Sequence, residues 1–235
     1  MINVDRIYQR VLTLANKEQR GYITPQEFNL YANQAQMEIL EQYFYDINQF
    51  SNLPGNSTEY SDMVGLIDEK LNVLRVTNTF TASAGVINMS NITNPDMYKL
   101  GSIYTGPHEI EEINYNEFKL RSKSPLTDPS NTSGSLQNYM YYESNGNINI
   151  QPVLTGPVEI SYIKIPNKVV WGYVVLNKKA LYNAGSSTNF ELHHAEENEL
   201  VYKILGYAGI TLKKPDVIQS SGALEIAKVQ QEKQG

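Results

Sequence analysis

The 235-residue chain contains no cysteine, one tryptophan and three histidines. The absence of cysteine excludes disulfide bonds and thiolate metal sites, and it is compatible with assembly in a reducing cytoplasm. No apolar run reaches the roughly 18 residues that a membrane helix needs, so we expect no membrane span. The first residues, Met-Ile-Asn-Val-Asp-Arg, lack the basic-then-apolar order of a signal peptide.

Basic charge is also scarce, because the formal net charge is −6. A general nucleic-acid binder would carry a basic face, so this function class is disfavoured. A channel through which DNA slides is not excluded. Acidic or neutral walls suit such a channel, since each cationic contact with a phosphate would add sequence-independent grip.

Motifs for catalysis are missing as well. The chain has no glycine-rich phosphate loop and no nucleophile elbow. The cluster most similar to metal ligands is His193-His194 followed by Glu196, Glu197 and Glu199, but it lacks the H-E-x-x-H order that presents two imidazoles on one helix face. An acidic first helical turn is the expected role of these carboxylates. We therefore predict no catalytic residue, no cofactor, no metal site and no enzymatic activity.

What is present begins with a capping box. Thr24 lies three residues before Glu27, and Pro25 stands at the first helical position. Apolar residues then recur at helical spacing, which predicts a helix from Pro25 to about Phe50. A first helix is expected over 3–17 with Asn3 as its N-cap, and a third near 61–71. The short connection between the first two helices predicts an antiparallel helical hairpin.

From about residue 74 the apolar period changes to two, which is typical of strands. The pair Asn145-Gly146 predicts a two-residue hairpin turn. A short helix is expected over 115–122, with Asn114 before its first turn. The middle of the chain is predicted to be an antiparallel sheet of about five to seven short strands.

Helical spacing returns near Leu192 and ends at Pro215, and a weakly amphipathic stretch follows over 216–233. The predicted fold class is α+β, with an N-terminal helical hairpin plus a third helix, a central antiparallel β-sheet region, and C-terminal helices that pack back on the helical part. The predicted domains are a ring-forming helical domain (1–73 plus 190–235), a β-rich domain (74–170) and a connection (171–189).

The segment 16–46, which includes the capping box and the helix after it, resembles the openings of virion structural proteins of crAss-like phages. More generally, the order of helices, strand-rich middle and closing helices is similar to that of the ring or adaptor proteins that join the portal to the tail in short-tailed phages. The resemblance implies a non-enzymatic head-to-tail connector subunit in the neck of the virion, assembled in the host bacterial cytoplasm.

The resemblance also implies the partners. These are identical subunits in a homo-oligomeric ring, expected to be a dodecamer, together with the portal protein and neighbouring tail ring proteins. Genomic DNA would pass through the channel during ejection without specific binding, and no membrane is involved. The loops near 127–135 and 186–189 are candidates for contacts between rings. The candidates for subunit contacts are Phe28, Tyr31, Tyr43, Phe44, Trp171, Val217 and Leu224.

Two alternatives stay open. Trp171 follows a predicted strand, where a lone tryptophan is more often a core plug between sheet and helices than an exposed docking anchor. The tyrosines of the middle region, Tyr139, Tyr141 and Tyr142, could form the platform of a carbohydrate- or receptor-binding tail module. Strand alternation places Tyr142 on the opposite face from the other two, so at most two could stack on one ligand.

Overall fold

The computed structural model describes residues 1–17, 23–51, 57–92, 96–124, 128, 139–211 and 223. By its internal contacts the chain divides into two compact units. We call residues 1–73 with 166–235 the helical unit, and residues 74–165 the sheet unit. The segment 171–189, which was predicted to be a connection, lies in the helical unit.

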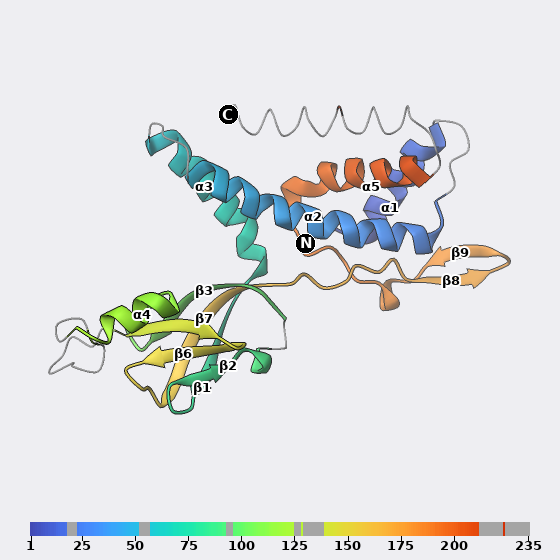
Figure 1. Cartoon of the computed structure of the whole chain (residues 1–235). Helices are drawn as coiled ribbons and strands as arrows, with labels where there is room; N and C mark the ends of the chain where they lie inside the picture. Colours follow the sequence, from blue (N-terminus) through green and yellow to red (C-terminus); the bar gives the residue numbers. More distant parts are fainter. Residues whose placement is uncertain are drawn as a thin grey trace. The chain divides into compact units, whose positions relative to one another are not determined.

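The helical unit is organised around helix α5. Its helices are α1 (Val4–Lys17), α2 (Pro25–Ser51), α3 (Ser57–Leu71) and α5 (Glu197–Thr211). Helix α5 lies against both α1 and α2, and α2 also contacts α3 (Figure 1). The side chains buried among these helices are small or aliphatic in the main, and they include Ile7, Val11, Phe28, Ala32, Ala35, Ile39, Leu200, Val201 and Ile204.

The predicted N-terminal helical hairpin is wrong. Helices α1 and α2 make their main helix contacts with α5 rather than with each other. The reason lies in α5, where Leu200, Val201, Ile204, Leu205 and Ala208 are all buried. A helix that is apolar around so much of its circumference needs neighbours on more than one side, so α1 and α2 both pack on α5. They touch each other through Tyr8 and Phe28, whose ring centroids are 4.7 Å apart.

Two of the three predicted N-terminal caps are confirmed, whereas Asn114 precedes its short helix without a side-chain cap hydrogen bond. The Glu27 carboxylate accepts hydrogen bonds from the Thr24 backbone N–H at 2.9 Å and from the Thr24 hydroxyl at 2.7 Å, and the Glu27 N–H donates to Thr24 Oγ1 at 3.3 Å. Asn3 accepts the Arg6 N–H at 3.0 Å and so begins α1. These contacts satisfy backbone donors that the helices themselves leave unpaired.

The sheet unit contains one seven-stranded sheet, in the order β1-β7-β3-β4-β5-β6-β2. The two ends of this order also touch, because β1 and β2 are consecutive and contact each other, so the sheet is nearly closed into a barrel. The strands are β1 (Arg75–Ala82), β2 (Val86–Asn88), β3 (Met97–Thr105), β4 (His108–Glu112), β5 (Met140–Ser144), β6 (Asn147–Gln151) and β7 (Gly156–Lys164).

The prediction of an antiparallel sheet is also wrong, because β4 and β5 pair in parallel. A parallel pair needs a long crossover connection, and the chain between Glu112 and Met140 provides one, with helix α4 (Tyr115–Arg121) within it. The predicted short helix is thereby confirmed, and so is the β5–β6 hairpin, whose turn residues Asn145 and Gly146 both have positive φ. With a mixed sheet and no helical hairpin, the predicted fold class is contradicted.

A second sheet was not predicted at all. Strands β8 (Tyr173–Leu176) and β9 (Lys179–Tyr182) form a two-stranded hairpin within the helical unit. Figure 1 shows this hairpin extending away from the helices past the end of α2 where that helix begins. Among the described residues, no helix combines the length and apolarity needed to cross a membrane.

Candidate docking surface

The base of the β8–β9 hairpin is held by amide side chains of α2. Asn33 donates to the Val169 carbonyl and accepts the Val169 N–H, both at 2.8 Å. Asn29 makes the same pair of contacts with the backbone of Trp171, at 3.4 and 2.7 Å. These two asparagines are four residues apart, so they lie on one side of α2. Their side-chain amides pair with the backbone N–H and C=O groups of Val169 and Trp171, as the backbone of a neighbouring strand would.

The returning chain is held in the same way. Gln36 is buried, donates to the Asn167 carbonyl at 3.0 Å and accepts the Glu191 N–H at 3.1 Å. The Glu191 carboxylate in turn accepts from the backbone and side chain of Asn167 at 2.9 and 3.0 Å. The chain that enters the hairpin and the chain that leaves it are therefore both tied to one face of α2.

Trp171 is a core residue of the helical unit, at 3% exposure. Its indole N–H donates to Asp5 at 2.9 Å, and its ring lies 4.4 Å from the ring of Tyr8. Tyr173 and Tyr182, which face each other across the hairpin, both lie 5.8 Å from the same indole. The Trp171 side chain thus packs between the helices and the first residue pair of the hairpin.

Beyond that pair, the hairpin is apolar and exposed. Val174, Val175 and Leu176 are 55–62% exposed, and Leu181 is 50% exposed. Val174 pairs directly with Leu181, so these two and Leu176 share one face of the hairpin. Single exposed apolar residues are ordinary on protein surfaces, but three of them on one face of a projecting element indicate an interaction site.

The hairpin and its flanking residues are also basic, although the chain as a whole is acidic. Residues 166–189 contain Lys168, Lys178 and Lys179 and no aspartate or glutamate, although the whole chain carries a formal charge of −6. Lys178 occupies the two-residue turn with Asn177, and both have positive φ, as the favoured hairpin turn requires. The projecting tip therefore combines apolar side chains with positive charge.

The carboxylates that resembled metal ligands are held by basic side chains instead. Glu196, which is almost fully buried, pairs with Lys70 at 2.8 Å, and Glu197 pairs with Arg10 at 2.7 Å and with Arg6 at 3.0 Å. His193 caps the short helix that follows, since its Nδ1 accepts the Ala195 N–H. Within the described ranges, no group of three or more His, Asp or Glu side chains lies close enough together to hold a metal ion.

A second ionic group lies beside the first. Lys203 is buried on α5 and lies 3.3 Å from Glu38 of α2 and 3.9 Å from Glu199. The Tyr207 hydroxyl donates to the same Glu38 carboxylate. Buried charges that are paired in this way tie helices together, and breaking one such pair leaves an uncompensated charge. We assign these groups to the architecture of the helical unit.

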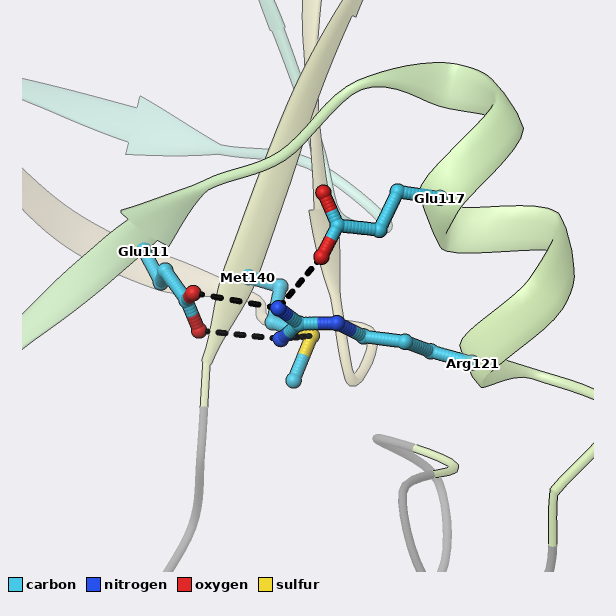
Figure 2. Close-up of polar contacts among 4 residues, drawn as sticks. All are labelled: Glu111, Glu117, Arg121 and Met140. Atoms are coloured by element: carbon cyan, nitrogen blue, oxygen red, sulfur yellow. Dashed lines mark hydrogen bonds and ion pairs between the residues drawn. The ribbon is translucent and has the colours of Figure 1, made fainter.

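In the sheet unit, Arg121 joins α4 to the sheet. Figure 2 shows its guanidinium between the Glu111 and Glu117 carboxylates, with the Met140 sulfur beside it. Hydrogen bonds to Glu111 and then to Glu117 raise the pKa of Arg121 above its ordinary value. Next to this group is a concavity of about 420 Å³ with Glu109, Glu112 and Tyr141 in its lining.

The acidic lining of this concavity affects the protonation of its neighbours. Burial, followed by the charges of Glu112 and Glu143, raises the pKa of Tyr141. Burial and then the charge of Glu112 raise the pKa of Glu143. The concavity is therefore acidic, since Glu109, Glu111 and Glu112 all line it.

The predicted interface residues have mixed placements. Phe28 and Tyr43 are buried inside the helical unit, and Tyr31 stacks on Tyr207 at 6.2 Å between ring centroids, so these rings are used within the subunit. Phe44 is half-buried on α2. Val217 and Leu224 lie outside the described residues.

The predicted contact loops and the three tyrosines of the proposed platform also have mixed placements. The loop 127–135 lies outside the described residues except for Asp128, whereas Thr188 bridges to Val170 and Asn189 accepts the Val4 N–H. Tyr141 is buried in the core of the sheet unit, and Tyr142 packs between Tyr115 and Phe118 of α4. Tyr139 is half-buried against the same core. These three rings therefore form no shared exposed surface.

The hairpin itself was missed by sequence reasoning, although a signal existed. Tyr173-Val-Val-Leu176 is rich in β-branched residues, and Asn177 suits the first position of a tight turn. The second turn residue is lysine instead of the usual glycine, which weakens the pattern. No protein-family model matches the chain, and no curated protein sequence matches it either.

Proposed function

We propose that the chain is a non-enzymatic structural subunit of a phage neck, a ring or adaptor protein that joins the portal to the tail around the DNA channel. The single observation that carries this proposal is the projecting hairpin, which presents Val174, Leu176 and Leu181 on one exposed face. Exposed apolar surface of this kind is typical of a protein that works by contact with another macromolecule. The resemblance of residues 16–46 to virion proteins of crAss-like phages directs the choice of assembly.

The mechanism of such a protein is geometric. Each copy offers one element to its neighbour and receives the same element from the copy on its other side. Such heterologous contacts close into a ring when the rotation between copies divides a full turn. The acid excess of the chain suits a channel wall, since phosphates would be repelled and DNA would slide.

The alternative function is a carbohydrate- or receptor-binding tail module with exposed tyrosines as its binding platform. The structure does not provide that platform, because Tyr141 is buried and Tyr142 packs on α4. The subunit role therefore has the stronger support, with the virion neck as its location and the portal and tail proteins as its partners.

The test is the mass of the purified full chain, measured by native mass spectrometry and by electron microscopy at several concentrations. We expect closed rings of a dozen copies. A chain that stays monomeric up to the highest soluble concentration, or that copurifies as a single copy per virion, would contradict the proposed function.

A further inference from the structure

The hairpin face and the outer side of helix α2 are complementary in both charge and polarity. We propose that the β8–β9 hairpin of one copy docks on the exposed side of α2 of a second copy of this chain. This inference rests on the proposed ring assembly, and it names the two surfaces that would form the repeated contact. The exposed side of α2 consists of Leu30, Gln34, Glu41 and Tyr45, and we call it the α2 stripe.

The α2 stripe and the hairpin differ in the sign of their charge. Glu41 gives the stripe a negative charge, and helix α2 contains no lysine or arginine, whereas the turn end of the hairpin carries Lys178 and Lys179 and no acid. Leu30 and Tyr45 are 66% and 65% exposed at the two ends of the stripe. An apolar hairpin with two lysines at its tip is thus matched by a helix face that carries a carboxylate between two exposed apolar residues.

The hairpin is also short enough to lie along the α2 stripe. The four residues of β8 span about 13 Å at the usual rise of a strand. The stripe from Leu30 to Tyr45 spans about 22 Å at the usual rise of a helix. The hairpin therefore fits along the stripe with room for the lysines of the turn to reach Glu41.

The hairpin cannot cover the stripe of its own chain. Asn29, Asn33 and Gln36 hold the base of the hairpin from one side of α2. At about 100° per residue, the centre of the stripe lies more than a quarter-turn around the helix from the centre of these three amides. The contact must therefore come from another copy. Because the two surfaces differ, it is heterologous and propagates from copy to copy.

The hairpin also has strand edges that a partner can use. β8 and β9 pair only with each other in their sheet, so each strand leaves an edge open to pairing. An anionic membrane or DNA could in principle attract the lysines. The remainder of the chain is strongly acidic, however, and it would repel either polyanion.

The first test uses the full-length chain, which has no native cysteine, so that introduced thiols are the only ones present. The variant Gln34→Cys/Leu176→Cys is oxidised and run on a non-reducing gel. We expect a ladder of covalent multimers, because each copy carries one thiol on each of the two surfaces. The single variants Gln34→Cys and Leu176→Cys are the matched controls, and neither should form a ladder beyond the dimer.

The second test weakens the contact without disturbing the fold. The variant Val174→Thr/Leu176→Thr keeps residues with good β propensity but removes apolar surface, and Leu120→Thr is the control, since Leu120 is an exposed leucine on α4 of the sheet unit. We expect the hairpin variant to raise the concentration needed for ring assembly at least about tenfold. The control should assemble like the wild type, and Trp171 fluorescence should report an unchanged hairpin base in both.

The outcomes separate the two proposals. If the wild type forms rings but the double-cysteine ladder is absent and the hairpin variant assembles normally, the docking inference is overturned and the ring function stands. If the wild type is monomeric, both fall. If the variant Lys178→Gln/Lys179→Gln loses binding to phosphatidylglycerol vesicles or to duplex DNA while its rings stay intact, the hairpin serves that polyanion and the inference is overturned.

Discussion

The chain contains two hairpins with the same local design and opposite surroundings. Both β5–β6 and β8–β9 turn through two residues of positive φ, each beginning with asparagine. In β5–β6 the side chains of Tyr141, Ile148 and Ile150 are buried in the core of the sheet unit. In β8–β9 the corresponding apolar side chains are exposed beyond the first residue pair. A hairpin therefore forms for local reasons, but whether it builds a core or offers a surface depends on what covers it.

The largest expected difference concerns the removal of apolar side chains. Ile148→Ala should lower the unfolding free energy of the sheet unit by about 3 kcal/mol, because it leaves a cavity in a fully buried site. Leu176→Ala should change the unfolding free energy of the dissociated chain by less than about 0.5 kcal/mol, because the side chain is exposed. Urea titrations followed by circular dichroism measure both. Equal losses would mean that Leu176 is part of a core, and the comparison would fail.

A smaller effect is expected where the exposed hairpin is anchored. Asn33→Ala removes both hydrogen bonds to Val169 and should cost about 2 kcal/mol, because two backbone groups lose their partner. The anchor should loosen, so acrylamide should quench Trp171, the only tryptophan in the chain, more strongly than in the wild type. Gln26→Ala, at an exposed position of the same helix, is the control and should leave quenching unchanged. Unaltered quenching in Asn33→Ala would show that the amide contacts do not hold the hairpin.

The smallest effect concerns the start of the helix that anchors the hairpin. The Thr24 backbone N–H and then the Thr24 hydroxyl lower the pKa of Glu27 below its usual 4.5. A lowered folded-state pKa gives stability that is present above the usual value and is lost as the pH falls through the lowered one. Glu27→Gln should therefore cost about 0.5 kcal/mol at pH 7 and less at pH 3. Unfolding midpoints at the two pH values provide the measurement, and a pH-independent difference would exclude the charge as its cause.

Local signals in the sequence predicted local structure well. The capping box of Thr24 and Glu27, the Asn3 cap and the Asn145-Gly146 turn depend on residues within a few positions of each other, so their physics is complete in a short window. The short helix after Asn114 belongs to the same class. In each of these cases the interacting groups are neighbours along the chain.

Apart from the missed β8–β9 hairpin, whose turn lacks the usual glycine, the failures involve partners that are distant in sequence. Helix α1 makes its main helix contacts with α5 rather than with α2, and β4 pairs in parallel with β5 across the crossover that contains α4. Phe28 and Tyr43 were predicted to be interface residues because their helix is broadly apolar, but both are buried within the helical unit, where Phe28 packs on Tyr8 of α1. The spacing of apolar residues predicts that one face of a helix is buried, but it does not predict which element packs on that face.

By itself, the sequence determined where α1 and α2 begin, that Asn145-Gly146 forms a tight turn and that the chain is acidic, because these properties belong to neighbouring residues or to simple composition. Only the tertiary structure decided that Trp171 is buried, that Asn29, Asn33 and Gln36 hold the base of a hairpin, and that the apolar tip of this hairpin is left uncovered. Burial is a property of the whole packing arrangement, and the three amides of α2 meet a segment more than a hundred residues away in the sequence.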